Sequence, residues 1–477
     1  MSTILKQRRV GDEKDWCHDG IEDGQLLTKR SLGESNGKSK RHAWRRVSIR
    51  NKCAILAGFI CFFLLGQRLL YPTPRLPILN VDIEVPDANE WPLIHIVQSR
   101  FMQEQGPLET LGMARLKLFE SFCLPSMVQQ TSQNFFWIIK TDPQFTTTAA
   151  FGRLVELVEP HDNIYLVASN TNYVFGNAGL EGSWRDGKEA LDLLQSKIYT
   201  GNMTKLKAAM ALREVRPILE TRLDADDGLH TKFIEYIQTE ALFRFRPNDD
   251  SGDSSVPNWL YWCSRRHIEW HSSTDGSLSK EQETNAGSPE FGYMNMVQHD
   301  KICVTPGVTI GYNTMEDDNI VDVPRYGHDV LYKRVFNSSS CYSSSDGDDN
   351  DSDEDGTKTP RGPCLELIED FLFMAIRSRT WTSTGMDKVD LPSVDVLVQD
   401  EDFTEKLWRV SEYAFGVTKT SVQKTQDFLV SNKRAIAAEN LLGQCTTGHS
   451  CKGSAKEKLR KIVNSKPKAY QRGYTTY

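Results

Sequence analysis

The strongest constraint on the fold of this chain is an alternation of strand-like and helix-like segments that begins at residue 93. Short apolar runs rich in β-branched and aromatic residues alternate with longer segments whose apolar residues recur every three or four positions. The expected strands cover 93–99, 134–142, 163–168 and the start of 215–228, and the expected helices cover 108–130, 152–159, 188–199 and 230–245. This order is typical of an α/β fold with a mostly parallel sheet covered by helices on both faces.

The second half of the chain has a less regular pattern. Residues 259–270 and 301–312 are strand-like with a polar loop between them, whereas 364–379 and most of 402–465 are helix-like. Residues 337–360 form a Ser/Asp tract that cannot offset its own ordering entropy, which predicts an exposed disordered insertion. A calcium loop there is excluded, because Gly362 stands where the bidentate glutamate would be needed.

Composition excludes several classes of protein. With 477 residues, 39% hydrophobic and 25% charged, the chain can bury a large core, and a mean hydropathy of -0.47 excludes a multi-span membrane protein. The net charge is -7, although residues 1–52 carry 13 Lys/Arg against 7 Asp/Glu. The remainder is therefore acidic and has no obvious basic surface for nucleic acid.

One membrane span is expected near the N-terminus. The stretch Cys53–Tyr71 is apolar apart from Gln67 and Arg68, and it would extend about 28 Å as a helix. Residues 38–52 hold seven Lys/Arg and no acid, and no signal-peptidase site follows the apolar run, which weighs against a cleaved signal peptide or a buried core helix. The expected organisation is a cytoplasmic basic tail (1–52), a signal anchor (53–71), a stem (72–92), a lumenal domain (93–465) and a C-terminal tail (466–477).

A type II protein of the Golgi or ER membrane should show lumenal features after the span. N-glycosylation sequons stand at Asn202, Asn337 and Asn350. Seven cysteines follow the apolar run, and the closest pair, Cys445 and Cys451, is a disulfide candidate. The odd number leaves one thiol free or paired between chains.

The constellation with the most chemical content is the acidic turn, Asp224-Ala225-Asp226-Asp227, at the expected end of a parallel strand. Carboxylates at alternate positions point the same way and can share a divalent cation, Mn²⁺ or Mg²⁺. These metals prefer a few carboxylates plus phosphate oxygens, so the expected ligand is a diphosphate. A helix N-cap would explain one aspartate without function. Phosphatases with a D-x-D motif carry it after the first strand, and this turn follows the fourth.

Six blocks of sequence resemble the putative rhamnosyltransferase family of glycosyltransferases. They are IHIVQSRF, residues 115–131, NFFWIIKTD, TRLDADDGLHTKFI, CVTPGVTIGY and RTWTSTGM, and residues 443–459 resemble the family's tail. The similarity spans about 93–465, interrupted by the insertion. It implies a GT-A-like fold, a nucleotide-sugar donor and a divalent cation.

The resemblance implies roles for individual residues. Asp224, Asp226 and Asp227 would lie at the metal and diphosphate. The expected donor-binding residues are Arg100 and Arg115 at the phosphates, Asp142 at the base or ribose, and Arg222, which could instead pair with the acidic turn. A surface ion pair is the alternative explanation for Arg100, Arg115 and Asp142.

The general base is not identified by the pattern. The candidates are Asp317, Asp318, His328, Asp329 and Asp400. The tryptophans and tyrosine of 259–270 could stack on a sugar, although aromatic residues that alternate along a strand are more often core. Thr382 and Ser383 match a family block whose role does not follow from the residues.

These features predict a membrane-anchored glycosyltransferase that moves a sugar, with rhamnose named by the family, from a nucleotide donor to a glycan or glycoconjugate acceptor. The alternatives are a non-catalytic lumenal lectin or scaffold on the same fold, and a metal-dependent phosphohydrolase. The sequence determines neither the donor, the acceptor nor the stereochemical outcome.

Overall fold

The computed structural model describes residues 92–446, apart from gaps at 104, 170–192, 194–195, 213–214, 246–255, 273–290, 300–301, 314–327, 337, 339, 343–362, 369–373, 381 and 383–400. All described residues belong to a compact unit that runs from Leu79 to Tyr477. The predicted basic tail, the anchor at 53–71, nearly all of the stem, the C-terminal tail and most of the acidic insertion lie outside them. Within the described part, no helix is both long and apolar enough to span a bilayer.

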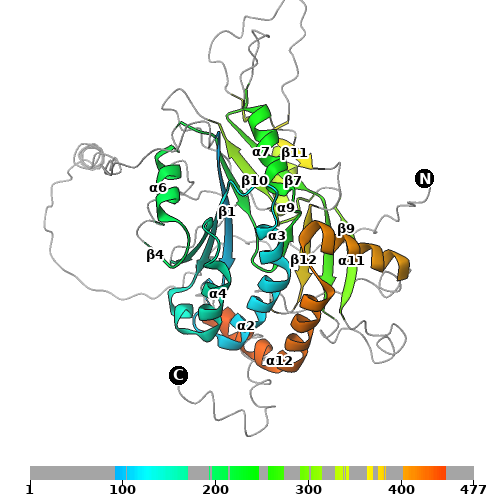
Figure 1. Cartoon of the computed structure of the whole chain (residues 1–477). Helices are drawn as coiled ribbons and strands as arrows, with labels where there is room; N and C mark the ends of the chain where they lie inside the picture. The colour runs from blue at the N-terminus through cyan, green and yellow to red at the C-terminus, as the bar shows by residue number, and fades with distance from the viewer. Residues whose placement is uncertain are drawn as a thin grey trace, which may run out of the picture. The chain divides into compact units, whose positions relative to one another are not determined.

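A mixed eight-stranded sheet forms the centre of this unit (Figure 1). Its strands, in spatial order, are β11 (Leu365–Ile368), β7 (Trp259–Ser264), β10 (Thr309–Tyr312), β5 (Ile218–Arg222), β1 (Ile94–Phe101), β2 (Phe136–Thr141), β3 (Ile164–Ala168) and β4 (Lys197–Ile198). The neighbours β5, β1, β2 and β3 are parallel, while β10 and β4 run antiparallel to the strands beside them. The predicted α/β class is confirmed, with a sheet in which only β10 and β4 run antiparallel to their neighbours.

Helices cover both faces of the sheet because its central strands are buried on both sides. On one face, α2 (Glu109–Leu118), α3 (Leu124–Val128), α4 (Ala149–Val158) and α7 (Phe233–Arg244) share an apolar cluster with the sheet. Two further helices join the same cluster: α12 (Lys419–Thr446) packs on α2, and α11 (Glu401–Phe415) packs on residues 293–298. The other face of the sheet packs against α6 (Met203–Leu212) and α9 (His328–Val335). The helix α12 lies along α2, where the Leu111 N–H donates to Glu439 at 2.7 Å (Figure 1).

The segment 108–130 is helical as predicted but widens at its centre into a π-helix, η1 (Phe119–Cys123). Pro125 lies just after it and has no N–H to donate to the carbonyl four residues earlier. The Leu124 N–H instead bonds the Phe119 carbonyl, five residues back. The π-turn thus satisfies the backbone next to a proline, and it places Cys123 beside the acidic turn.

A second, four-stranded sheet was not predicted. It consists of β6 (Asp227–Leu229), β12 (Ala375–Arg379), β8 (Arg266–His271) and β9 (Tyr293–Gln298), in that order. The predicted helix at 364–379 is wrong, because its two ends form β11 and β12. A short apolar run fits a helix and a buried strand equally well, and here pairing with β7 and β8 decides between them.

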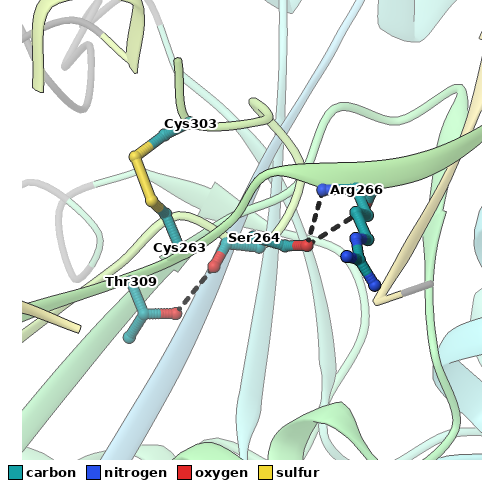
Figure 2. Close-up of a disulfide and its surroundings, with 6 residues drawn as sticks. Cys263, Ser264, Arg266, Cys303 and Thr309 are labelled. Atoms are coloured by element: carbon teal, nitrogen blue, oxygen red, sulfur yellow. Dashed lines mark hydrogen bonds between the residues drawn. A yellow bond between two sulfur atoms is a disulfide. The ribbon is translucent and has the colours of Figure 1, made fainter. Parts of the chain in front are cut away.

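The predicted single strand 259–270 divides at Arg265 into β7 and β8, which belong to different sheets. The Ser264 hydroxyl accepts from the Arg266 N–H at 3.1 Å and lies 2.9 Å from the Arg266 carbonyl (Figure 2). Beside this turn Cys263 forms a disulfide with Cys303 (Figure 2). The hydroxyl thus replaces ladder hydrogen bonds where the chain leaves one sheet for the other.

Smaller differences concern element ends. The predicted helix 188–199 is wrong at its C-terminal end, where Lys197–Ile198 is β4, and α6 follows it unpredicted. Of the predicted strand 301–312 only Thr309–Tyr312 is a strand, and β9 lies in the expected polar loop. The helices α11 and α12 confirm the helical C-terminal part as far as it is described.

Two disulfides join cysteines that the sequence could not pair. They are Cys263–Cys303 and Cys341–Cys364, and the second closes the base of the acidic insertion. Cys123 is a buried free thiol, as the odd number of cysteines allowed. The predicted pair of Cys445 and Cys451 cannot be examined, because Cys451 and the side chain of Cys445 lie outside the described residues.

Acidification is expected to weaken the fold through His95 of β1. Burial lowers the pKa of His95 from 6.5 to about 3, and its Nε2 lies 2.8 Å from the Thr221 hydroxyl. Below pH 6.5, His95 in the unfolded chain takes up a proton, whereas buried His95 in the folded chain does not. This difference lowers the free energy of unfolding by about 1.4 kcal/mol for each pH unit of further acidification. Urea unfolding of the wild type and His95→Gln between pH 7 and 5 checks this. Identical pH slopes in the two proteins would contradict it.

Candidate functional site

The candidate site lies where β1 and β5 end side by side. From β1 the chain continues to β2 on one side of the sheet and later returns to β5 on the other side. Because β1 and β5 are parallel, with Gln98 opposite Arg222, their carboxyl ends share one edge. A crevice at such a topological switch point is where open α/β sheets bind ligands.

The acidic turn follows β5 directly and is a tight turn. The Asp227 N–H donates to the Asp224 carbonyl at 3.0 Å, which closes the turn over Ala225 and Asp226. The Asp224 side chain is 30% exposed, whereas that of Asp227 is 4% exposed. The turn therefore presents Asp224 outward and directs Asp227 into the protein.

Asp227 fastens the turn to the second sheet. One carboxylate oxygen accepts the Ser378 N–H at 3.1 Å, and the other lies 3.5 Å from Arg377 Nε, an ion-pair distance. Both partners belong to β12, which was predicted to be a helix. Of the three aspartates, Asp227 therefore has a structural role, and Asp224 and Asp226 are the better metal ligands.

The three aspartates of the turn differ in the direction of their pKa shifts. Burial acts to raise the pKa of Asp224, but Arg222, Arg100 and Arg377 outweigh it and lower that pKa. Burial and the charge of Asp224 raise the pKa of Asp226, against Arg115 and Arg377. Burial and the charge of Asp226 raise the pKa of Asp227 well above its usual value. The surroundings therefore favour the ionised form of Asp224 most.

Asp224 and Asp226 are the carboxylates of the turn that could hold a divalent cation. Within the described ranges, no three His, Cys, Asp or Glu side chains converge as metal ligands, so a protein-only metal cage is not present there. Two carboxylates completed by phosphate oxygens and water are a usual set for Mg²⁺. The residues fit a metal bound together with a diphosphate, and the metal itself stays a prediction.

The predicted donor-binding arginines at this edge differ in their exposure and in their contacts. Arg222 Nη2 is 3.3 Å from Asp224 Oδ1, so the ion pair foreseen as an alternative is present. Arg100 is exposed at the end of β1, while Arg115 of α2 is partly buried. Burial lowers the pKa of Arg115 to about 10, although Asp226 and Asp224 act to raise it.

Arg115 also holds two loops at the site. It donates to the Gln105 side chain and, at 2.8 Å, to the Thr382 carbonyl. Its Nη1 lies 3.7 Å from the sulfur of Met102, a residue with a φ of 54°. A left-handed backbone is uncommon for a residue other than glycine and is found more often at functional sites.

Asp142 has a clear local role. One of its oxygens accepts the Gln144 N–H at 2.7 Å and caps the 3₁₀ helix η2 (Pro143–Thr147). The other accepts the Gly106 N–H at 3.3 Å, which ties the loop after β1 to the end of β2. Its contact with a base or ribose stays a prediction.

None of the five base candidates has its side chain among the described residues. Asp317, Asp318 and Asp400 lie outside the described residues, as do the side chains of His328 and Asp329 at the start of α9. The aromatic residues of 259–270 are core: Trp259, Tyr261, Trp262 and Trp270 are at most 1% exposed. They therefore form no sugar-stacking wall in this structure.

A cluster of charged residues on the second sheet was not predicted from the sequence. Glu269 of β8 is buried, with Oε1 2.9 Å from His267 Nε2 and 3.2 Å from Arg379 Nε. Its Oε2 lies 3.3 Å from His271 Nε2. The signal was a period of two in HIEWH and IRSR, in which charged residues alternate with apolar or small ones. Because 364–379 was predicted to be a helix, the alternation in IRSR was not recognised as that of a strand.

Comparison with known proteins gives one result. Residues 110–174 match the profile of a family described as "putative rhamnosyl transferase", and no curated protein matches the chain. The matched segment runs from α2 to just beyond β3 and includes Arg115 and Asp142, but it ends before the acidic turn. Over this segment, the chain is similar to the putative rhamnosyl transferases, as its sequence blocks indicated.

Proposed function

We propose that this chain is a glycosyltransferase that moves a sugar from a nucleotide-sugar donor to a glycan or glycoconjugate acceptor. The observation that carries the proposal is the acidic turn at the carboxyl ends of β1 and β5, where Arg222 lies 3.3 Å from Asp224. The match of residues 110–174 to the profile described as "putative rhamnosyl transferase" supports a glycosyltransferase. The GT-A-like assignment of this fold is part of the proposal.

Each residue at the edge would have a distinct task. Asp224 and Asp226 would hold Mn²⁺ or Mg²⁺ at the donor's diphosphate. The bound cation would neutralise the charge that develops on the leaving diphosphate. Arg100, exposed at the end of β1, would contact the nucleotide phosphates, whereas Arg222 would keep Asp224 ionised and oriented. Arg115 supports the loop after β1 from below.

The test is release of nucleoside diphosphate from a panel of UDP-, dTDP- and GDP-sugars by the full chain, with and without Mn²⁺. We expect metal-dependent release from one donor, increased by a panel of methyl glycosides as acceptors. Release of inorganic phosphate instead would indicate a phosphohydrolase. No release from any donor of the panel, together with no thermal shift on addition of nucleotide, would favour a lectin or scaffold.

We further propose a single-pass type II topology with this domain in the lumen of the Golgi or ER. Support comes from the apolar stretch 53–71 with its basic flank and from two disulfides, which persist in oxidising compartments. The proposed span lies outside the described residues.

A lumenal domain predicts an N-linked glycan on Asn202. This residue lies at the start of α6, where its side-chain oxygen accepts the N–H groups of Thr204 and Lys205 and its amide nitrogen is left for the sugar. We expect the chain expressed in secretory cells to carry one more glycan than its Thr204→Ala variant, measured by mobility before and after enzymatic deglycosylation. The variant keeps the asparagine cap and is the matched control. Equal mobility would contradict the lumenal placement of this segment.

A further inference from the structure

The strand β12 runs past the acidic turn. Arg377 of β12 is the direct partner of Asp227 of β6, and the two strands are antiparallel. The step from Arg377 to the end of β12 therefore leads toward the residues that precede Asp227, which are those of the acidic turn. Diagonal neighbours across an antiparallel pair lie about 7 to 8 Å apart, so the backbone of Arg379 lies at about this distance from that of Asp227.

The segment that follows β12 is also tied to the turn. The Thr382 carbonyl accepts a hydrogen bond from Arg115 Nη2 at 2.8 Å. Arg115 in turn lies close enough to Asp226 and Asp224 for their charges to act on its pKa. Two separate contacts therefore hold the end of β12 beside the acidic turn, one at Asp227 and the other at Thr382.

Arg379 is the accessible member of the charged cluster on the second sheet. Its side chain is 28% exposed, whereas those of Glu269, His271 and His267 are 9%, 1% and 0% exposed. Arg379 stands two residues after Arg377 on one strand, so both project to the face on which Asp227 lies. Of its four members, the cluster therefore presents one cationic group on this face.

The guanidinium of Arg379 is held through one of its three nitrogens. Its Nε lies 3.2 Å from Glu269 Oε1, an ion-pair distance. Burial acts to raise the pKa of Glu269, but the neighbouring His267, His271 and Arg379 outweigh it and hold that pKa well below its usual value. Neither Nη1 nor Nη2 of Arg379 has a hydrogen-bond or ion-pair partner among the described residues. This pair of donors matches the oxygens of a phosphate.

We propose that Arg379 binds the diphosphate of the nucleotide-sugar donor and that Glu269 is its positioning residue. The inference rests on the proposed function, because it concerns the same donor. A diphosphate held at Asp224 and Asp226 has more anionic oxygens than one cation contacts, and Arg379 lies where it can reach the others. Because Glu269 fixes the guanidinium in advance, less side-chain entropy is lost on binding. Arg379 would then stabilise the negative charge of the leaving diphosphate.

The test compares Arg379→Gln and Arg379→Lys with Arg409→Gln in the full chain. Arg409 is 78% exposed on α11 and pairs with Glu405, so its replacement is the matched control. In calorimetry with UDP, dTDP and GDP, we expect Arg379→Gln to weaken binding of the preferred diphosphate by about 10- to 100-fold, with and without Mn²⁺. KM for the donor should rise by a similar factor, while KM for the acceptor changes by less than about threefold. Arg379→Lys keeps the charge and should recover part of the loss, and Arg409→Gln should match the wild type.

A double variant separates donor binding from folding. Arg379→Gln leaves buried Glu269 without its cationic partner, so this variant is expected to unfold at a lower urea concentration than the wild type. Glu269→Gln combined with Arg379→Gln removes both charges and should recover part of that stability, yet bind the diphosphate as weakly as Arg379→Gln. Wild-type affinity for the diphosphate in either variant would overturn the assignment.

The acceptor supplies the other source of an anion. Assays with methyl glucuronide and methyl glucoside as acceptors distinguish it from the donor. If Arg379→Gln kept the wild-type KM for the donor and raised only the KM for methyl glucuronide, Arg379 would bind an acceptor carboxylate. That result would overturn the diphosphate assignment while the transferase function stands. A wild-type chain that binds no diphosphate and is inactive with every donor would overturn both.

Discussion

The Asp226→Asn variant is expected to lose sugar transfer by about 10²- to 10³-fold while keeping or gaining stability. Replacing one carboxylate removes half of the proposed metal site and with it the charge that would oppose the leaving diphosphate. The same carboxylate is repelled by Asp224 and is incompletely offset by Arg115 and Arg377. Its neutralisation should therefore leave the free energy of unfolding unchanged within about 0.5 kcal/mol, or raise it.

Transfer assays with saturating Mn²⁺ and urea unfolding without metal measure the two effects. Chelation of the metal from the wild type should reproduce the loss of transfer, and Mn²⁺ should restore the wild type but not the variant. Asp162→Asn is the matched control, because Asp162 is 72% exposed and precedes β3 at the amino edge of the sheet. Wild-type transfer activity in Asp226→Asn would contradict the assignment of Asp226 as a metal ligand.

The Arg377→Leu variant is expected to lose about 3 to 5 kcal/mol of stability. Arg377 lies between Asp227 and Glu269, and the charges of Asp227, Asp224, Glu269 and Asp226 all raise its pKa. A leucine of similar size would leave Asp227, which is almost fully buried, without its cationic partner. Removing one member of a buried pair costs the desolvation of the other, so the loss should far exceed that for a surface pair.

Chemical unfolding of three proteins checks this explanation. Arg409→Leu breaks the exposed pair of Arg409 with Glu405 and should cost less than about 1 kcal/mol. Adding Asp227→Asn to Arg377→Leu should recover part of the loss, because the asparagine still accepts from Ser378 and carries no charge. Strictly additive losses in the double variant would show that the two charges are not coupled.

The first half of the fold could be predicted because its signals are local. Strands such as Phe136–Thr141 and helices such as Ala149–Val158 each carry their own period of apolar residues. Their order implies parallel neighbours, and parallel neighbours place Arg100 and the acidic turn at one edge. The sequence therefore predicted the carboxylates and arginines at the centre of the candidate site.

The sequence by itself determined the α/β class, the acidic turn at the end of β5 and the arginines near it. Only the tertiary structure decided that Asp227 anchors to β12, that 364–379 is two strands, and that Glu269 gathers His267, His271 and Arg379. The physical reason is that the contacts with β12 and the pairing of β11 with β7 join residues about 100 to 150 positions apart. A short run such as Ala375–Arg379 has no strong preference of its own, and hydrogen bonds to β6 and β8 determine both its conformation and which of its charges meet the turn.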